Sequence, residues 1–120
     1  MPYVDGFIVP VPKKNLEAYI RISKRCGKIW REYGALDYRE WVADDVKVGK
    51  FTSFPRSVKL KPGEVVVFAW ITYKSRAQRD KINAKVMADP RLKDMFGDGT
   101  SPPFDGKRMI YGGFESLVKV

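Results

Sequence analysis

The sequence predicts an α+β fold with the order strand, helix, strand, strand, helix, strand, which is the ferredoxin-like βαββαβ arrangement on a four-stranded antiparallel sheet. Three observations predict it: a β-branched and aromatic run at 65–73, an amphipathic stretch at 13–33, and a capping box at 75–78. The chain has 120 residues, a length typical of one domain, and we expect residues 1–120 to form that domain.

The first half of the chain is expected to form a strand, a long helix and a second strand. Residues 3–12 are predicted as a strand closed by two prolines, because proline removes a donor from the hydrogen-bonded ladder. In 13–33, apolar side chains recur every three or four residues, and Gly34 follows at the position of a helix C-cap. Residues 36–43 are the second predicted strand.

The second half is expected to add two strands, a helix and a short helical turn. Residues 65–73 have the composition of a central strand. Residues 75–88 begin with the capping box and are the second predicted helix. Residues 89–95 repeat the start signal with an acidic cap followed by proline, and 109–120 are the last predicted strand.

Both faces of the predicted sheet are apolar. Along 65–71, successive side chains point to opposite faces, and each face receives only apolar residues. Two helices cover one face of a four-stranded sheet, so the other face needs a second cover. A homodimer through the open sheet face is the simplest cover. The alternative is that residues 44–64, a connection expected to be an arm or lid with its own short strand, fold over that face.

The composition excludes several kinds of chemistry. The chain has no His, which excludes a Ser-His-Asp or Cys-His nucleophile and a His-ligated haem or zinc. The single Cys26 excludes an internal disulfide and any Cys-cluster metal site, so we expect no metal and no cofactor. The longest apolar run is too short to cross a bilayer, and residues 1–6 lack the features of a signal peptide. We therefore expect a soluble, cytoplasmic protein without a membrane partner.

Several motifs resemble those of a known family. They are YVDGF at 3–7, WVADDV at 41–46, EVVVFAW at 64–70, RD at 79–80, MADPR at 87–91 and FDGKRMIYGGFE at 104–115. Together they are similar to the YbaA-like family of uncharacterised bacterial proteins, a domain of unknown function. The resemblance implies a ferredoxin-like fold of the dimeric α/β-barrel type, and it brings no catalytic residues with it. The net charge of +9 is more basic than we expect of the family.

Two acidic residues are candidate catalytic acids or bases. Asp5 lies within an apolar strand, where desolvation raises the pKa of a carboxyl group. The alternative is an aspartate at the sheet edge that pairs with Arg108 or Lys107. Asp105 precedes these two bases, and Arg108, with Lys107, is a candidate to bind a substrate carboxylate. The alternative for Asp105 is an ordinary turn in which its side chain caps its own backbone.

Four aromatic residues are candidates to line a cavity between sheet and helices, because an aromatic side chain with one polar end suits a flat ligand. They are Trp41 and Trp70, as ligand-binding residues, and Tyr73 and Tyr111, as candidate acids or bases. The alternative is that all four belong to the core. The pair Gly112-Gly113 within the last strand indicates a bulge or the close approach of another backbone or ligand, although dimer packing explains it equally well.

The basic excess raises the question of a nucleic-acid partner. Bases concentrate in 13–32, 47–61 and 74–93. Residues 65–70 lack the glycine and basic residue of RNA-reading sheets, so sequence-specific RNA recognition is not expected. The glycine-containing segment 97–101 does not complete a P-loop. We expect a homodimer that binds or transforms a small organic molecule, including an anionic one. The alternatives are non-specific, salt-sensitive nucleic-acid binding and a purely structural or regulatory dimer.

Overall fold

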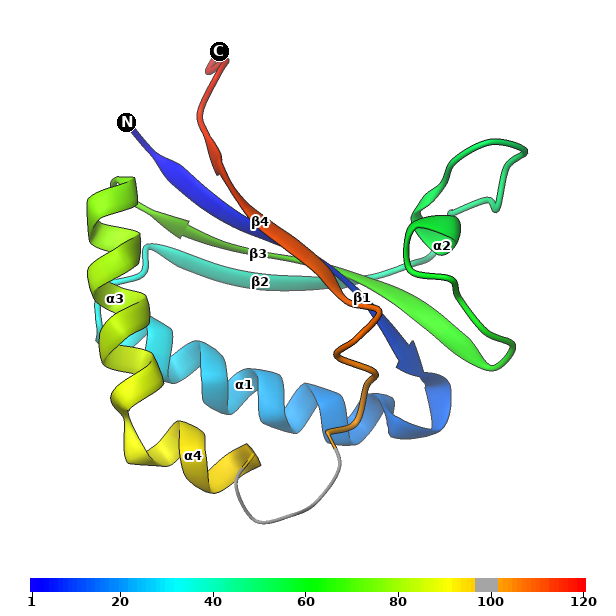
Figure 1. The fold of residues 1–120 in the computed structure, drawn as a ribbon, viewed down its shortest axis with the longest axis horizontal. Coiled ribbons are helices and arrows are strands. Elements are labelled where there is room, and N and C mark those ends of the chain that lie inside the picture. Colours follow the sequence, from blue (N-terminus) through cyan, green and yellow to red (C-terminus); the bar gives the residue numbers. More distant parts are fainter. Residues whose placement is uncertain (97–101) are drawn as a thin grey trace.

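Four strands form one antiparallel sheet, and the main helices lie on one side of it (Figure 1). The computed structural model describes residues 1–96 and 102–120. The strands are β1 Tyr3–Pro12, β2 Asp37–Val42, β3 Glu64–Tyr73 and β4 Ile110–Glu115, in the order β2-β3-β1-β4. The helices are the 3₁₀ turn η1 Lys13–Asn15, α1 Leu16–Glu32, α2 Phe54–Ser57, α3 Arg76–Ala88 and α4 Pro90–Phe96. The predicted α+β, ferredoxin-like fold is confirmed.

The predicted helix boundaries follow from local hydrogen bonds. The side chain of Ser75 accepts a hydrogen bond from the backbone N–H of Gln78 at 3.2 Å, which caps α3. Asp89 does the same for the N–H of Arg91 at 2.8 Å, where α4 begins. After α1, Gly34 has a φ of 116°, which is the left-handed conformation that ends helices and favours glycine.

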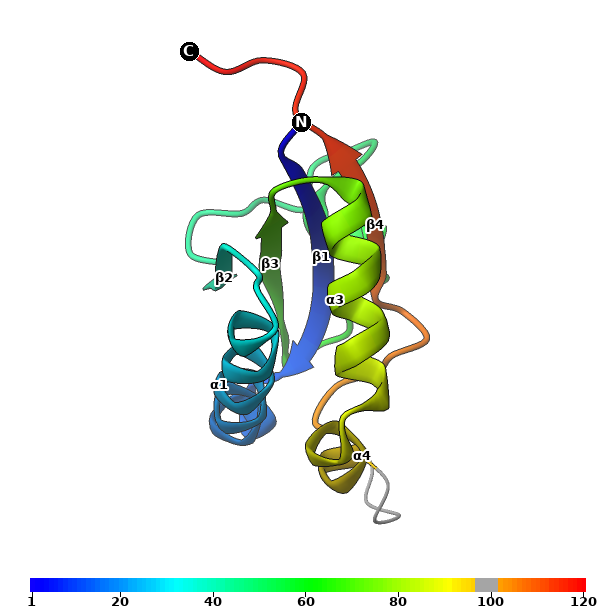
Figure 2. The ribbon, with the colours of Figure 1, turned by 90° about the vertical axis from the view of Figure 1, so that its left-hand side faces the viewer.

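The sheet has a helix face and an open face. On β1 the odd-numbered residues point toward the helices, and the register carries the same side across β3. Figure 2 shows α1 and α3 on this side of the sheet. The buried core comprises Tyr3, Val9, Val11, Tyr19, Ile29, Val67, Ile71, Tyr73, Ile82 and Val86. Each fully buried aliphatic or aromatic side chain stabilises the fold by about 1.5–3 kcal/mol.

The prediction that the last strand reaches residue 120 is wrong. Glu115 pairs with Tyr3, the first residue of β1, and the backbone N–H of Ser116 donates to the carbonyl of Pro2 at 3.2 Å. Beyond that point β1 offers no further partner, so β4 ends at Glu115. A β-prone sequence forms a strand only where a neighbouring strand completes its hydrogen bonds.

The connection between β2 and β3, residues 43–63, contains no strand of its own, contrary to the expectation for 44–64, but it does contain the helical turn α2. We call residues 43–63 the arm. Ser53 accepts a hydrogen bond from the backbone N–H of Arg56 at 3.1 Å, and Pro55 occupies the first turn. A capping serine followed by proline favours a helical start over a strand. Figure 1 shows α2 on the open-face side of the sheet.

The arm covers one end of the open face. Val58 of the arm and Val66 of β3 are buried, and the rings of Phe54 and Phe68 lie 5.8 Å apart. The rest of the open face carries exposed apolar side chains on β2 and β4. Trp41 is 46% exposed and Phe114 is 60% exposed. The alternative of an intramolecular cover therefore holds for one end of the face only.

Candidate functional site

A cavity of about 350 Å³ lies between the helix face of the sheet and α1. Its walls are almost wholly apolar, and its lining also includes the exposed residues Arg39 and Met87, so it opens to solvent. The apolar lining includes Phe7, Val9, Ile22, Cys26, Trp30, Ala69, Ile71, Leu92, Phe104 and Met109. This volume is at the small end of the roughly 300–1,000 Å³ that is usual for small-molecule sites.

Among residues 1–96 and 102–120, one carboxylate stands in this apolar cavity, that of Glu40 on β2. The hydroxyl groups of Tyr19 and Ser23, both on α1, donate hydrogen bonds to its two carboxylate oxygens. The hydroxyl of Tyr38 lies 3.4 Å from one of those oxygens and 3.4 Å from the Ser23 hydroxyl. We call Tyr19, Ser23, Tyr38 and Glu40 the Glu40 cluster.

Burial controls the acidity of the Glu40 cluster. Burial raises the pKa of Glu40, while the hydrogen bonds from Tyr19 and Tyr38 oppose that rise. Burial, and next the negative charge of Glu40, also raise the pKa values of both tyrosines, which therefore keep their protons. The arrangement gives one carboxylate that can gain or release a proton, surrounded by hydroxyl groups that stay neutral.

Local sequence spacing brings the Glu40 cluster together. Tyr19 and Ser23 are four residues apart on α1 and so share one face of the helix. Tyr38 and Glu40 alternate with the outward residues of β2 and point to the helix face, where Glu40 pairs with Ala69. Gly27 of α1 packs directly on the ring of Tyr38, and a Cβ atom at this position would overlap that ring. The glycine therefore sets how closely α1 approaches β2.

Asp5 lies in the sheet interior, away from the Glu40 cluster. Its strand β1 lies between β3 and β4, and its carboxylate pairs with Nε of Arg79 on α3 at 3.1 Å. The prediction of an edge aspartate paired with Arg108 or Lys107 is wrong. Because Arg79 follows Asp5 by 74 positions in the chain, only the packing of α3 on the sheet could show this pair.

The packing of Arg79 near Asp5 also explains why position 113 of β4 is a glycine. A Cβ atom on Gly113 would overlap the hydroxyl of Tyr3 and the guanidinium of Arg79, which itself lies 5.0 Å from the centre of the Tyr3 ring. Gly112 differs, because a Cβ there would meet Phe114 at an ordinary 3.9 Å. The pair Gly112-Gly113 predicted the close approach of another group. At Gly113, that group consists of the Tyr3 and Arg79 side chains of this same chain.

Arg108 is engaged by the base of the arm. It makes two hydrogen bonds to the carboxylate of Glu64, at 2.6 and 2.8 Å, and one to Asp105 at 2.9 Å. It also donates to the backbone carbonyls of Val58 and Lys59, at 3.3 and 3.0 Å. These bonds lower the pKa values of both carboxyl groups and leave Arg108 outside the lining of the cavity. Its role in this arrangement is to fasten the arm to the start of β4.

Residues 105–107, before β4, form an ordinary aspartate turn, which was the alternative to a catalytic role for Asp105. The side chain of Asp105 accepts a hydrogen bond from the backbone N–H of Lys107 at 3.0 Å, as in an ordinary aspartate turn. Lys107 is exposed. The segment 97–101 lies outside the described residues.

The four candidate aromatic residues do not gather around one cavity. Trp41 and Trp70 lie on the open face, 5.3 Å apart, although Trp70 also reaches the lining of the Glu40 cavity. Tyr73 is fully buried at the other end of the helix face, and burial, together with the charge of Asp5, raises its pKa. Tyr111, on the edge strand β4, is 72% exposed and stacks on Phe7. Because successive side chains of β3 point to opposite faces of the sheet, Trp70 and Tyr73 lie on opposite faces.

Cys26 contributes to the cavity wall as a thiol. It is buried, and burial raises its pKa to about 11, so it stays protonated near neutral pH. Within residues 1–96 and 102–120, no group of three or more potential metal-binding side chains comes together. Over the same residues, no helix combines the length and the apolar character needed to cross a membrane.

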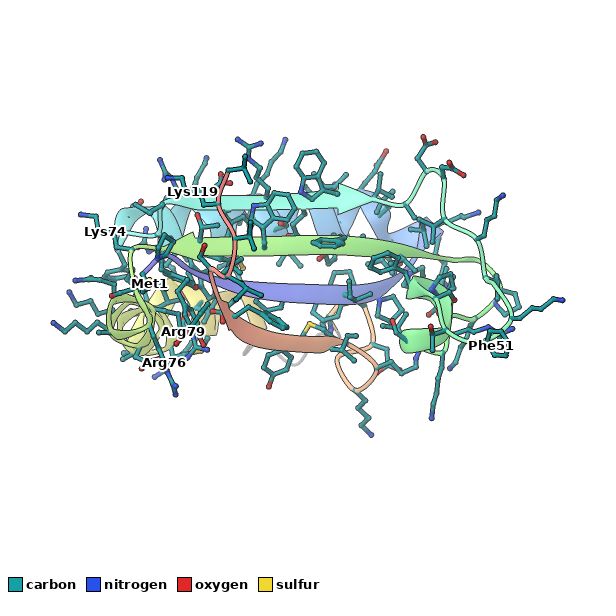
Figure 3. The ribbon with its side chains drawn as sticks, turned by 90° about the horizontal axis from the view of Figure 1, so that it is seen from above. Met1, Phe51, Lys74, Arg76, Arg79 and Lys119 are labelled. Atoms are coloured by element: carbon teal, nitrogen blue, oxygen red, sulfur yellow. The ribbon has the colours of Figure 1, made fainter. Side chains whose placement is uncertain are left out.

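The three basic regions do not form a single face. Residues 13–32 and 74–93 contain α1 and α3, on the helix side, whereas 47–61 lie in the arm, on the opposite side of the sheet (Figure 1). Figure 3, which looks onto the open face, shows long side chains projecting around the rim of the sheet. A nucleic-acid partner stays a prediction.

Fold and cavity together define a ferredoxin-like α+β protein with a small, apolar cavity between its sheet and helices. The comparisons with known proteins support the fold and identify the family. The chain belongs to the family described as "Protein of unknown function (DUF1428)", whose model matches residues 2–106. It is 49% identical over 118 residues to the uncharacterized protein YbaA of Escherichia coli K12, covering 98% of each chain. The resemblance seen in the sequence motifs is confirmed.

Two solved structures share the fold at low sequence identity. A dimeric ferredoxin-like protein from an uncultured marine organism matches with a TM-score of 0.60 and 12% identity, over 100% of both chains. Rv0793 from Mycobacterium tuberculosis matches with a TM-score of 0.56 and 14% identity, over 99% of this chain and 98% of that one. At this identity the likeness concerns the fold alone.

Proposed function

We propose that this protein binds a small, largely apolar molecule in the cavity between the sheet and α1, with Glu40 as its polar anchor. One observation carries the proposal: among the described residues, a single carboxylate, ringed by hydroxyl groups, stands in a cavity that is otherwise apolar and aromatic. A buried carboxylate is costly to the fold unless it is paired, so a site that keeps one is a candidate for function.

The charge of the site narrows the ligand class. Glu40 repels an anion, and Arg39, the basic residue in the lining, carries its side chain on the open face, where it is paired with Asp37 at 3.1 Å. The expected ligand is therefore a neutral molecule with at least one hydrogen-bond donor, of one or two rings in size. This replaces the broader expectation that included anionic molecules.

Proton transfer is the chemistry that the Glu40 cluster supports if the ligand is transformed. A carboxylate in an apolar site accepts a proton more readily than one in water, because burial disfavours its charged form. The hydroxyl groups of Tyr19 and Ser23 each donate to one oxygen of the carboxylate, and a hydroxyl can rotate to accept a hydrogen bond when its partner oxygen takes up the proton. Such a reaction needs no His.

A homodimer through the open face is the second part of the proposal. Exposed Trp41, Phe68 and Phe114 form an apolar surface on the side opposite the helices. The cavity lies on the helix face, so dimer formation leaves it accessible. In an aqueous setting such as the cytoplasm, an apolar surface of this kind needs a cover.

The experiment is a comparison of a neutral and an anionic aromatic probe. Ligand-observed NMR with phenol and with benzoate at matched concentrations should show binding of phenol and little binding of benzoate. Glu40→Gln should remove the discrimination against benzoate. Glu17→Gln, on the exposed surface of α1, is the matched control and should behave as the wild type. Equal binding of the two probes by the wild type, or an unchanged preference in Glu40→Gln, would contradict the proposal.

A further inference from the structure

The segment after β4 carries exposed aliphatic side chains. Residues 116–120 form no regular structure, and Leu117 is 94% and Val118 77% exposed. We call these residues the C-terminal tail. Water-exposed aliphatic side chains in a row are unusual in a monomer and indicate a surface that is covered in the functional assembly.

The tail rises from the sheet on the open-face side. In Figure 1 it leaves β4 in the direction opposite to α1 and α3. In Figures 2 and 3 it runs across the strands from the β4 edge toward the β2 edge, and Figure 3 marks Lys119 on this path. The tail therefore stands on the same side of the sheet as the exposed apolar surface.

The sequence of the tail is that of a strand without a neighbour. Its aliphatic residues predict a strand through residue 120, yet the ladder ends at Glu115 because β1 begins at Tyr3. The N–H and C=O groups beyond Ser116 thus have no strand of this chain beside them in the described structure. A second chain can supply what β1 does not.

The area of the open face supports contact with a second chain. Its exposed apolar side chains offer roughly 600 Å² per chain, which doubles to about the lower limit of a stable interface. The tail adds roughly 400 Å², which brings the total to the standard size of about 800 Å² or more per partner. The charged pair Asp37–Arg39 also lies on this face, on the edge strand β2.

We infer that the C-terminal tail binds a second copy of this chain, with its valines packed on the partner's open face. The inference rests on the homodimer in the proposed function and gives it a specific contact. Each chain contributes one face and one tail, so the contact is reciprocal, as a two-fold dimer requires. Without the tail, the face alone forms a much weaker dimer.

The test is a sedimentation-equilibrium series on the full chain over a wide range of concentration. Val118→Asp combined with Val120→Asp should weaken the dimer by about 100-fold or more, because two buried aliphatic side chains are replaced by charges. Lys119→Glu changes the net charge by the same amount at the residue between them and should change the dissociation constant less than about threefold. Wild-type affinity in the double variant overturns the inference.

A second measurement separates a tail on the partner from a tail on its own sheet. A nitroxide is attached to Lys119→Cys in unlabelled protein, which is mixed with ¹⁵N-labelled wild type. Broadening of the amide signals of Ile110 and Phe114 in the ¹⁵N-labelled copy is expected; its absence in a mixed dimer overturns the inference. A wild type that stays monomeric at every concentration overturns both the tail and the dimer, whereas the phenol experiment tests the cavity separately.

Discussion

Replacing each of two adjacent glycines in β4 by alanine should give opposite effects on stability. In Gly113→Ala the new methyl group overlaps the Tyr3 hydroxyl and the Arg79 guanidinium. Tyr3 is only 8% exposed and β1 is an inner strand, so the Tyr3 ring has little room to move, and the Arg79 guanidinium can shift only at the expense of its bond to Asp5. Overpacking of this kind costs about 1–3 kcal/mol, and displacing Arg79 also weakens its bond to buried Asp5.

The expected result is a net loss of about 2 kcal/mol for Gly113→Ala, after subtracting the roughly 0.5–1 kcal/mol that alanine gains over glycine in a strand. For a domain of this size that corresponds to a fall of about 8 °C in Tm. In Gly112→Ala the methyl group meets Phe114 at 3.9 Å, so the gain stands alone and Tm should rise by about 2 °C.

The assay is thermal unfolding followed by circular dichroism, at one fixed protein concentration because dimer formation also shifts Tm. The two variants differ by one position in the same strand, so they control for each other. A Gly113→Ala protein as stable as the wild type, or equal losses in both variants, would refute the packing of Tyr3 and Arg79 described above.

Three further predictions concern the site and the arm. Burial raises the pKa of Glu40 in the folded protein above its ordinary 4.5. The protonated Glu40 side chain therefore contributes its full stabilisation below pH 4.5, and this stabilisation declines as the pH rises through the pKa of the folded protein. Glu40→Gln should remove this decline in a plot of Tm against pH. Gly27→Ala should leave Tm nearly unchanged, because the helix gain of about 1 kcal/mol offsets the clash with Tyr38, yet it should weaken phenol binding about tenfold in an NMR titration. Arg108→Ala should lower Tm by about 5 °C and expose the arm to limited proteolysis, whereas Arg39→Ala, at an exposed pair, should change Tm by less than about 2 °C.

Local signals in the sequence were sufficient to predict the elements of the fold. Ser75 and Asp89 set the starts of α3 and α4 through bonds to residues two or three positions away. The β-branched run in β3 marked a strand that lies between β2 and β1. The end of β4 was not predictable in this way, because it depends on where β1 begins, more than 100 residues earlier in the chain.

The candidate site shows the limit of residue-by-residue reasoning. Glu40 is not among the residues that the sequence predicts, because an acid near the end of a strand resembles an ordinary surface residue. Alternation along β2 does place it beside Tyr38 on the apolar side, and that signal could have found it. The ion pair of Asp5 with Arg79 and the engagement of Arg108 by Glu64 join distant segments, so only the packed structure shows them.

The positions of the three tryptophans allow assembly and ligand binding to be followed by intrinsic circular dichroism and fluorescence. Trp41 and Trp70 lie 5.3 Å apart with their ring planes inclined by 41° on the open face, whereas Trp30 borders the cavity, with Nε1 bonded to Asn83 at 3.0 Å. Two indoles held close at such an angle couple their electronic transitions and give a paired band in the near-ultraviolet and far-ultraviolet circular dichroism. Assembly through the open face should alter that band and leave the fluorescence of Trp30 unchanged, while occupation of the cavity should alter the fluorescence of Trp30 and, because Trp70 also reaches the cavity lining, the band as well. Two events on opposite sides of one sheet can thus be followed in the same unlabelled sample.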